Sequence, residues 1–282
     1  MIVFPNCKIN LGLNIIRKRS DGFHDIETIF YPLTIHDALE ITQTELEENT
    51  QFSIFNIQFS TSGLIVEGKV ADNLCVRAWQ LIKKDFPELP SVKMHLHKTI
   101  PHGAGLGGGS ADAAFTLTLL NQKFNLELST EKLLGYALQL GSDCPFFIVN
   151  NPCFATGRGE LLEPIVLNLS AYTFVIVNPG IHVNTSEAFS LITPVLPSTS
   201  IKKIIQQPVE TWRDELKNDF EEIIFSKYSE IKNIKEGLYK AGAVYASMSG
   251  SGSTVYGIFE KDKEPQLSFP AAYFVKRLPG RR

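Results

Sequence analysis

Alternating apolar and polar residues predict several strands along the chain. The clearest alternation runs from Val92 to Ile100 and predicts a half-buried strand. Residues 26–35 and 52–59 are rich in Ile, Phe, Thr and Tyr, which is typical of strands. Two apolar runs farther along, Tyr172–Val177 and Thr254–Phe259, are predicted as strands as well.

Helices are predicted where apolar residues recur every three or four positions. In the first half, Asp72 is placed to cap a helix over about residues 74–86, and a second helix is expected over about 111–124. Ser129 is placed to cap a third helix, which Gly141 would end. The apolar side of this third helix is expected to contain Leu133, Leu134, Ala137 and Leu138.

The second half follows the same rules. Asn184 and Glu187 have the spacing of a capping box for a short helix. Helical spacing continues through Leu216, Phe220, Ile223, Ile224, Tyr228, Ile231 and Leu238. We expect a strand over 144–149 and a loop over 152–164 that joins two halves. Because strands and helices mix without a regular βαβ repeat, the pattern predicts an α+β fold, with domains over 1–155 and 156–282.

Composition and charge narrow the functional classes. The chain has 282 residues, 44% of them hydrophobic, and a net charge of −3, so we expect no nucleic-acid partner. No apolar run reaches the roughly 18 residues of a membrane helix, so we expect no membrane partner. The start of the chain, Met1–Pro5, lacks the basic and apolar regions of a signal peptide. We therefore expect a cytoplasmic protein, and its oligomeric state stays open.

The cysteines and paired histidines are expected to be structural. Cys7, Cys75, Cys144 and Cys153 form no CxxC pair, so reduced thiols are expected rather than zinc ligands or disulfides. His95 and His97 lie two residues apart and would share one face of a strand. Since no other clustered ligand is near them in the sequence, we expect surface or structural roles.

A glycine-rich segment over residues 101–112 carries the strongest functional pattern. Its glycines let the backbone approach a phosphate closely and turn successive N–H groups toward it. A helix follows directly, and its first N–H groups carry partial positive charge. The alternative is a flexible turn without a ligand. The predicted ATP-binding residues here are Pro101, Gly103, Ala104, Gly105, Leu106, Gly107, Gly108, Gly109, Ser110 and Ala111.

Other nucleotide motifs fit this segment poorly. Gly103, Gly105 and Gly108 satisfy the GxGxxG spacing of dinucleotide-binding folds. Such a fold would need an acidic residue at the end of a second strand, but Glu127 and Glu131 fall in or beside a predicted helix. The segment has no Gly-Lys-Ser/Thr, and the chain has no HRD or DFG triplet, which excludes a Walker loop and a protein kinase.

The glycine segment resembles the phosphate loop of the GHMP kinase superfamily. The resemblance extends to blocks at Pro5–Leu13, Arg19–Thr28 and Met248–Thr254. Within the superfamily, Lys8–Leu11 and Asp21–His24 are similar to the 4-diphosphocytidyl-2-C-methyl-D-erythritol kinases.

Asp72–Leu74 and Leu140–Phe147 share this similarity. The chain departs from the family pattern at Cys7, Phe23 and Ser253, where alanine, tyrosine and proline are common.

The resemblance implies a fold and a reaction. The first domain would be ribosomal-S5-like and the second ferredoxin-like. The reaction would be ATP-dependent phosphorylation of the 2-hydroxyl of a small cytidylated methylerythritol, with Mg²⁺ to neutralise the phosphates. Asp143 would be the general base, and Lys8 would lie beside it and stabilise charge at the reacting oxygen. The alternative for this pair is a buried structural ion pair.

The resemblance also suggests contacts for both ligands. Phe23 would stack on the cytosine base and His24 would bind its edge. Further substrate contacts are expected from Asn10, Thr185, Phe189, Gly250 and Gly252. Asn73 and Lys98 would contact the base or ribose of ATP. Ser110 would bind phosphate or Mg²⁺, or simply cap the helix.

Two other functions remain open at this stage. One is another GHMP kinase that acts on homoserine, mevalonate or a sugar. The other is a non-catalytic protein that binds nucleotides.

Overall fold

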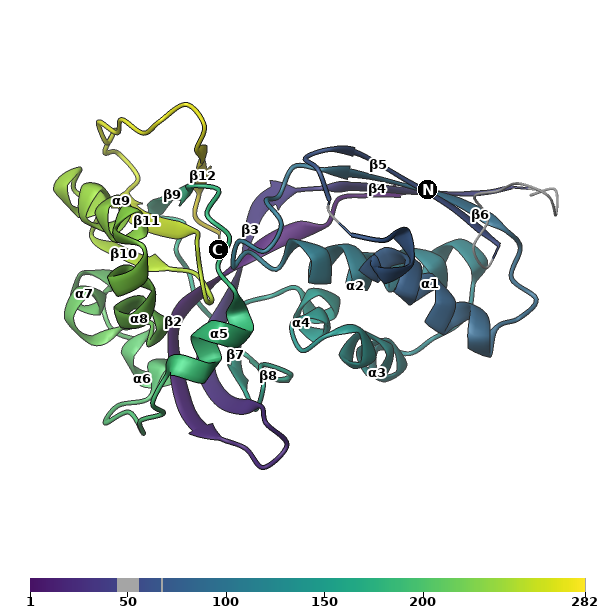
Figure 1. Ribbon diagram of the computed structural model, residues 1–282, viewed down its shortest axis with the longest axis horizontal. Coiled ribbons are helices and arrows are strands. Elements are labelled where there is room, and N and C mark those ends of the chain that lie inside the picture. Colours follow the sequence, from purple (N-terminus) through teal and green to yellow (C-terminus); the bar gives the residue numbers. More distant parts are fainter. Residues whose placement is uncertain (45–55, 67, 282) are drawn as a thin grey trace. The chain divides into compact units, whose positions relative to one another are not determined.

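The protein is described here from a computed structural model that covers residues 1–44, 56–66 and 68–281 (Figure 1). The chain divides into two compact units that interleave along the sequence. The first unit contains Met1–Cys7, Thr34–His102 and Gly107–Asn150. The second contains Lys8–Leu33, Gly103–Leu106 and Asn151–Arg282. The predicted domain boundary after residue 155 stays a prediction.

The first unit is built on one sheet. Its strand order is β1 (Ile2–Val3), β4 (Ala38–Gln43), β6 (Val92–Lys98) and β5 (Ile57–Gly63). β4 lies antiparallel to β1 and β6, whereas β5 lies parallel to β6. The predicted strand at 92–100 is confirmed as β6. Of the predicted strand at 52–59, residues 57–59 lie in β5, and 52–55 fall outside the described residues.

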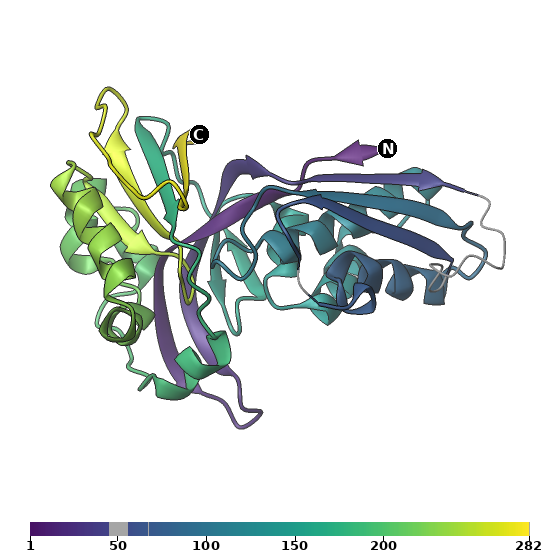
Figure 2. The ribbon, with the colours of Figure 1, turned by 45° about the horizontal axis from the view of Figure 1, so that its top comes forward.

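The helices of the first unit lie on one face of this sheet (Figures 1 and 2). After the 3-10 turn η1 they are α1 (Leu74–Asp85), α2 (Gly108–Phe124), α3 (Thr130–Leu140) and α4 (Cys144–Val149). Their apolar sides and the inner face of the sheet form one core, which includes Trp79, Ile82, Met94, Leu96, Leu117 and Leu120. The core therefore holds the strand before the glycine-rich segment against the helix after it.

The structure corrects the predicted start of α1. Asp72 ends the 3-10 turn η1 (Val70–Asp72), and Asn73 is the N-cap residue. The Oδ1 atom of Asn73 accepts a hydrogen bond of 2.9 Å from the backbone N–H of Cys75. Asparagine caps a helix as well as aspartate does, so the two adjacent residues could not be separated by type.

Residues 144–149 form the helix α4 rather than the predicted strand. Pro145 stands in the first turn, where its fixed φ suits a helix, and Asn150 ends the helix in a left-handed conformation. A short apolar run cannot distinguish a buried strand from a buried helix.

The predicted loop at 152–164 is also wrong. It contains the antiparallel strands β7 (Cys153–Thr156) and β8 (Leu161–Pro164). Here Gly157 and Gly159, both at positive φ, form the turn between the strands, and their turn character obscured the short strands on either side.

The predicted apolar side of α3 is partly wrong. Leu133 and Ala137 are buried as expected, but Leu138 is 39% exposed. Leu140 enters the core instead. Ser129 and Gly141 cap the helix at its two ends as predicted.

The second unit contains antiparallel sheets. One has the order β2 (Asn6–Lys18), β3 (His24–His36), β7 and β8. The other has the order β10 (Tyr245–Met248), β11 (Val255–Glu260), β9 (Tyr172–Asn178) and β12 (Phe274–Pro279). The strands predicted at 26–35, 172–177 and 254–259 are thereby confirmed as β3, β9 and β11. Mixed helices and mostly antiparallel strands confirm the α+β class.

Helices of the second unit complete its core. They are α5 (Thr185–Leu191), α6 (Ile201–Ile204), α7 (Trp212–Glu215), α8 (Phe220–Lys227) and α9 (Ser229–Lys240), with the 3-10 turn η2 (Val209–Thr211) before α7. Asn184 caps α5 by accepting from the N–H of Glu187, which confirms the N-cap half of the predicted capping box. α9 packs against β10 and β11, and the buried members of this core include Val177, Phe220, Ile231, Leu238 and Met248.

The cysteines and histidines take structural positions. Each of the four cysteines is buried and none forms a disulfide. Burial raises the pKa of Cys144 to about 12 and that of Cys153 to about 11, so both stay as thiols near neutral pH. His95 and His97 share one face of β6 and hydrogen-bond Ser62 of β5.

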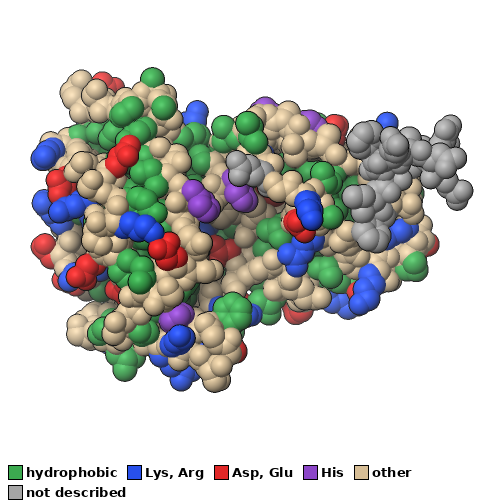
Figure 3. All heavy atoms as spheres, in the orientation of Figure 1, with side chains coloured by type: hydrophobic (Ala, Val, Ile, Leu, Met, Phe, Trp, Pro, Cys, Tyr) green, Lys and Arg blue, Asp and Glu red, His purple; other side chains and the backbone are tan. Residues whose placement is uncertain are grey.

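The charges on one face of the surface are mixed in sign, and the helices in the described part of the chain do not suit a bilayer. On the face drawn in Figure 3, Lys and Arg side chains are interspersed with Asp and Glu. Within the described residues, every helix is too short or too polar to span a bilayer.

The core of the first unit makes a stability prediction. Leu117 in α2 is fully buried, so Leu117→Ala should lower the free energy of unfolding by about 2–5 kcal/mol. Leu138→Ala removes the same atoms from an exposed site and should cost less than about 1 kcal/mol. Urea denaturation of both variants measures the difference, and equal losses would contradict the described packing.

Candidate functional site

The glycine-rich segment leads into α2 as expected. The N-cap residue of α2 is Gly107, at φ 69°, and no side chain caps the helix there. The first backbone N–H groups of α2 are therefore not blocked by a capping side chain and suit an anion. Positive φ values at Gly103 (62°) and Gly105 (77°) shape the loop before the helix, in the region that favours glycine.

Ser110 does not cap the helix, because α2 begins two residues earlier, at Gly108. Its side chain lies in the first turn and hydrogen-bonds the thiol of Cys144 at the start of α4. The alternative prediction, that Ser110 is the N-cap residue of this helix, is therefore wrong. Its hydroxyl oxygen still stands at the helix start, among the N–H groups that suit a phosphate.

Three segments that are distant in sequence meet in the second unit. The backbone N–H of Lys8 donates to the carbonyl of Leu106, at 2.9 Å. The N–H of Asn10 donates to Oγ of Ser249, at 3.2 Å. That hydroxyl donates in turn to the carbonyl of Gly105, at 2.7 Å. Strand β2, the glycine-rich loop and the loop after β10 are therefore joined by hydrogen bonds.

The close approach of the two glycine loops requires their glycines. A Cβ atom at Gly105 would lie 2.0 Å from the carbonyl oxygen of Ser249. At Gly250, whose φ is 58°, a Cβ atom would lie 3.3 Å from Cα of Gly105. Gly250, predicted as a substrate contact, thus lies against the glycine-rich loop.

Two residues that were not predicted as site residues shape the loop after β10. Nδ2 of Asn218 donates to the carbonyls of Met248 and Gly250, at 2.7 and 2.9 Å. The hydroxyl of Ser253, which replaces the common family proline, donates to the carbonyl of Ile181 at 2.6 Å. An isolated Asn in a loop carries no pattern that would have identified Asn218.

Lys8 lies on β2 and is 3% exposed. Its Nζ donates to Oδ1 of Asn10 at 2.7 Å and lies 4.4 Å from the centroid of the Phe30 ring. An amide oxygen and an aromatic face both stabilise an ammonium ion in a buried position. Asp143, its proposed partner, belongs to the first unit, where it occupies the N-cap position of α4 and is half-buried.

Aromatic side chains gather near the β2–β3 turn. His24 stacks on Phe189, with centroids 5.0 Å apart, and Phe189 meets Phe220 edge to face. Phe23 is 51% exposed, and the guanidinium of Arg158 lies 4.8 Å from its ring centroid. Phe23 thus offers aromatic surface to a ligand.

His24 differs from Phe23 in its burial. Burial lowers the pKa of His24, and the charge of Lys18 adds to this effect. The neutral imidazole has one donor and one acceptor, which suits the edge of a base. Thr185, also a predicted substrate residue, hydrogen-bonds Ser251 at 2.9 Å, so it contacts the loop after β10.

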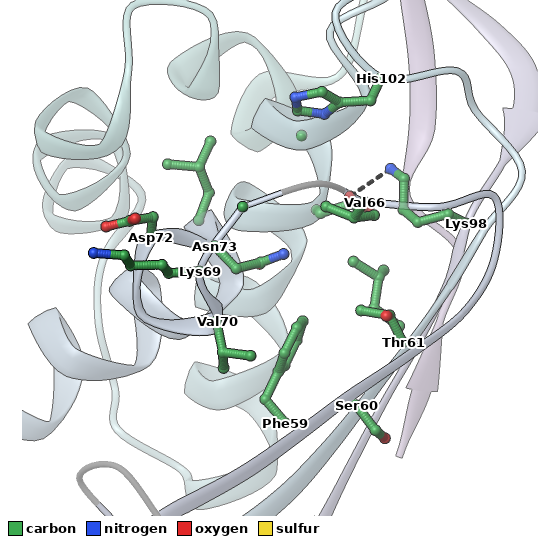
Figure 4. Close-up of a pocket in the computed structure, with 15 residues that line it drawn as sticks. Phe59, Ser60, Thr61, Val66, Lys69, Val70, Asp72, Asn73, Lys98 and His102 are labelled. Carbon is green, nitrogen blue, oxygen red and sulfur yellow. Dashed lines mark hydrogen bonds and ion pairs between the residues drawn. The ribbon is translucent and has the colours of Figure 1, made fainter.

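A cavity of about 380 Å³ opens in the first unit (Figure 4). Three predicted ATP-binding residues line it: Asn73, Lys98 and Gly109. The other lining residues come from β5, the segment before α1, the start of α1, β6, the glycine-rich segment and α2, and include Phe59, Thr61, Val70 and His102. The lining thus combines apolar side chains with several polar and charged ones.

Lys98 is more constrained than its predicted role implies. Its Nζ donates to Oδ2 of Asp112 at 2.6 Å and to Oδ2 of Asp37, and all three side chains are at most 4% exposed. Oδ1 of Asp37 accepts from the N–H groups of Thr99 and Ile100, at 2.6 and 2.9 Å. This cluster ties the end of β6 to the first turns of α2. A single sequence could not reveal it, because its members are distant along the chain.

The Lys98 cluster contains two carboxyl groups, of Asp37 and Asp112, and one ammonium group. Oδ1 of Asp112 is buried and has no hydrogen-bond partner. Burial is the largest cause that raises the pKa of this carboxyl, to about 7. A proton on Oδ1 would leave Oδ2 free to accept from Lys98, so protonation removes the excess negative charge, keeps that hydrogen bond and leaves the Lys98–Asp37 ion pair in place.

This cluster predicts a pH-dependent contribution to stability. Because the folded pKa lies above the unfolded value of about 3.9, the folded state binds more protons between these values, and stability from Asp112 falls as pH rises through that window. Asp112→Asn should remove this loss of stability, whereas the control Asp262→Asn, at an exposed carboxylate, should not. Urea denaturation from pH 5 to 8 measures the free energy of unfolding at each pH. If this free energy depended on pH in the same way in the wild type and in Asp112→Asn, the prediction would be contradicted.

Comparisons with known proteins agree with this architecture. The model of the GHMP kinase N-terminal domain matches residues 73–151, and that of the C-terminal domain matches residues 200–269. A solved structure of a 4-(cytidine 5'-diphospho)-2C-methyl-D-erythritol kinase is similar, with a TM-score of 0.77 and 29% identity. The match covers 92% of this chain and 90% of that one.

Curated relatives extend over nearly the whole chain. The 4-diphosphocytidyl-2-C-methyl-D-erythritol kinase of Bacteroides fragilis is 50% identical, over 97% of this chain and 97% of its own. The enzyme of that name from Azobacteroides pseudotrichonymphae is 52% identical, over 95% of this chain and 97% of its own. The resemblance found in the sequence is confirmed, and the chain belongs to the 4-diphosphocytidyl-2-C-methyl-D-erythritol kinase family of GHMP kinases.

Proposed function

We propose that this protein transfers the terminal phosphate of ATP to the 2-hydroxyl of 4-diphosphocytidyl-2-C-methyl-D-erythritol, a step of the non-mevalonate isoprenoid route. The observation that carries the proposal is the hydrogen-bonded junction of the Lys8–Asn10 strand, the glycine-rich loop and the loop after β10. A loop with the features of a phosphate cradle thereby directly adjoins a buried cation. Full-length relatives of this name support the choice of acceptor.

ATP would be held by two parts of the protein. The loop from Pro101 to Ala111 would bind the phosphates through backbone N–H groups at the start of α2. The cavity beside Asn73 would take the nucleoside. Lys98 would act there mainly through its ion pairs, since its ammonium already serves Asp37 and Asp112.

Mg²⁺ would arrive with the nucleotide. This ion prefers oxygen donors and is commonly held by one or two protein groups together with substrate phosphates. The Ser110 hydroxyl is such a donor, so the residues at the start of α2 fit the ion. When bound, Mg²⁺ neutralises charge on the phosphates.

The chemical step would use Lys8 and Asp143. Asp143 would accept the proton of the acceptor hydroxyl, which makes that oxygen a better nucleophile. The ammonium of Lys8 would stabilise the negative charge that develops at the reacting oxygens. Phosphoryl transfer needs mainly alignment and charge stabilisation, so two such groups suffice from the protein side.

The cytidylated substrate would be recognised in the second unit. Phe23 would stack on the cytosine and His24 would hydrogen-bond its edge, with Phe189 behind His24. Thr185, Gly250 and Gly252 would contact the diphosphate or sugar from the loop after β10 and its neighbour α5. Asn10 would face the acceptor end, next to Lys8.

The cellular setting and the domains are also proposals. We infer a cytoplasmic location, where ATP and a charged diphosphate substrate are both available, and no partner of nucleic acid or membrane. The N-terminal part to about residue 155 would carry ATP binding and catalysis, and residues 156–282 would complete the substrate site.

An assay of acceptor choice tests the function. ADP release, coupled to a spectrophotometric readout, should be fast with the cytidylated methylerythritol and at least about 100-fold lower in kcat/KM with homoserine or mevalonate, since neither offers a base to stack. The Asp143→Ala variant should retain ATP binding but lose turnover by about two to four orders of magnitude. Preference for either other acceptor would refute the assignment.

Base stacking makes a separate prediction. Phe23→Ala should raise KM for the cytidylated substrate roughly 10-fold and leave KM for ATP within about 2-fold, since stacking is worth about 1–3 kcal/mol. Phe23→Tyr keeps the aromatic face and should behave like wild type. Phe4→Ala, at another exposed phenylalanine, is the control. Equal losses for both substrates would argue against a cytosine site at Phe23.

A further inference from the structure

Thr28 of β3 is a buried polar residue without an assigned role. It is 0% exposed, and its hydroxyl donates to the backbone carbonyl of Gly12 in β2. A carbonyl oxygen can only accept, so the single hydroxyl hydrogen of Thr28 is committed to that bond. The hydroxyl oxygen can then only accept a hydrogen bond from its other neighbour.

That neighbour is the side-chain amide of Asn10. Nδ2 of Asn10 lies 3.0 Å from Oγ of Thr28 and donates to it. The two ends of an amide differ only in their hydrogen-bonding capacity, so the network decides which end faces which neighbour. Because Thr28 can only accept here, it selects the NH₂ end of Asn10, and the carbonyl end must face the opposite way.

The carbonyl end of Asn10 faces Lys8. Oδ1 accepts from Nζ of Lys8 at 2.7 Å, while the Phe30 ring supports the ammonium at 4.4 Å. With the amide reversed, its NH₂ group would face the ammonium, and two donors would oppose each other at that distance. The orientation of the amide therefore decides whether Asn10 attracts or repels the Lys8 ammonium.

The Asn10 backbone cannot adjust to compensate. Its N–H donates to Oγ of Ser249 at 3.2 Å, and its carbonyl accepts from the Tyr256 hydroxyl at 2.8 Å. Asn10 itself is 2% exposed. With the main chain fixed on both sides, rotation of the side-chain amide is the remaining freedom, and Thr28 removes it.

We propose that Thr28 is a positioning residue that fixes the Asn10 amide and thereby holds the Lys8 ammonium in place for phosphoryl transfer. The inference rests on the proposed function, because it gives Lys8 a catalytic role. Thr28 contacts neither ligand in this scheme. It acts on the rate through the position of one charge, and displacement of a catalytic group by about 1 Å is enough to cost about 100-fold in rate.

The test compares variants of Thr28 that differ in the hydroxyl. Thr28→Val keeps the shape and removes the hydroxyl, and Thr28→Ala removes it without risk of overpacking. Both should lower kcat roughly 10- to 100-fold while KM for ATP and for the cytidylated substrate change less than about 3-fold. Thr28→Ser keeps the hydroxyl and should restore kcat to within about 3-fold of wild type.

Two further variants distinguish failure of the inference about Thr28 from failure of the proposed function. Thr118→Val removes a partly buried hydroxyl that donates to the carbonyl of Ala114 within α2, and it should leave kcat unchanged. Lys8→Met tests the proposed function itself and should abolish turnover. Circular dichroism and thermal melting of every variant show the folded fraction, to which each kcat is normalised.

The outcomes are distinct. Loss of normalised kcat in Thr28→Val and Thr28→Ala, with rescue by Thr28→Ser, supports the inference. Wild-type kcat in Thr28→Val alongside an inactive Lys8→Met overturns the role of Thr28 and leaves the proposed function standing. Equal losses in Thr28→Ser and Thr28→Val also overturn it, since the hydroxyl would then not matter. Wild-type turnover in Lys8→Met overturns both proposals.

Discussion

The contact on which the site in the second unit depends is the approach of two backbones to each other. Gly105 lies so close to the carbonyl of Ser249 that a Cβ atom would come within 2.0 Å of it. Only glycine fits there, and its φ of 77° is also one that glycine favours. The contact brings the Ser249 hydroxyl between Gly105 and Asn10, and so connects the phosphate loop to the strand of Lys8.

Two lysines of this protein, Lys98 and Lys8, have buried ammonium groups. Lys98 lies between two carboxyl groups, an arrangement that links the two ends of the glycine-rich segment and occupies two of the three donors of its ammonium. Within its own unit, Lys8 donates to the side-chain amide of Asn10 and lies over the Phe30 ring. An ammonium held by an amide oxygen and an aromatic face is placed to act on negative charge that develops nearby. The first lysine thus shapes the loop, while the second is proposed to act in the chemistry.

The glycine-rich segment has a different neighbour on each side. Toward the second unit its residues Gly103–Leu106 hydrogen-bond β2 and the loop after β10. Toward the first unit, Gly107 begins α2, whose first turns are tied to β6 through Asp112. The glycine-rich loop is thus held at both ends by groups outside it, which keeps its N–H groups oriented, and no side chain caps the start of α2.

The sequence by itself determined the α+β class, most helices and strands, the glycine-rich loop that leads into α2, and the family. These follow from periodicity, caps and linked motifs, which depend on residues near each other in the chain. It misassigned α4 and the β7–β8 hairpin, because short apolar or glycine-containing stretches have no period long enough to decide them. Only the tertiary structure showed that Asp37 and Asp112 hold Lys98 and that Thr28 orients Asn10. Such contacts join residues far apart in sequence, and hydrogen-bond direction depends on geometry that no local pattern encodes.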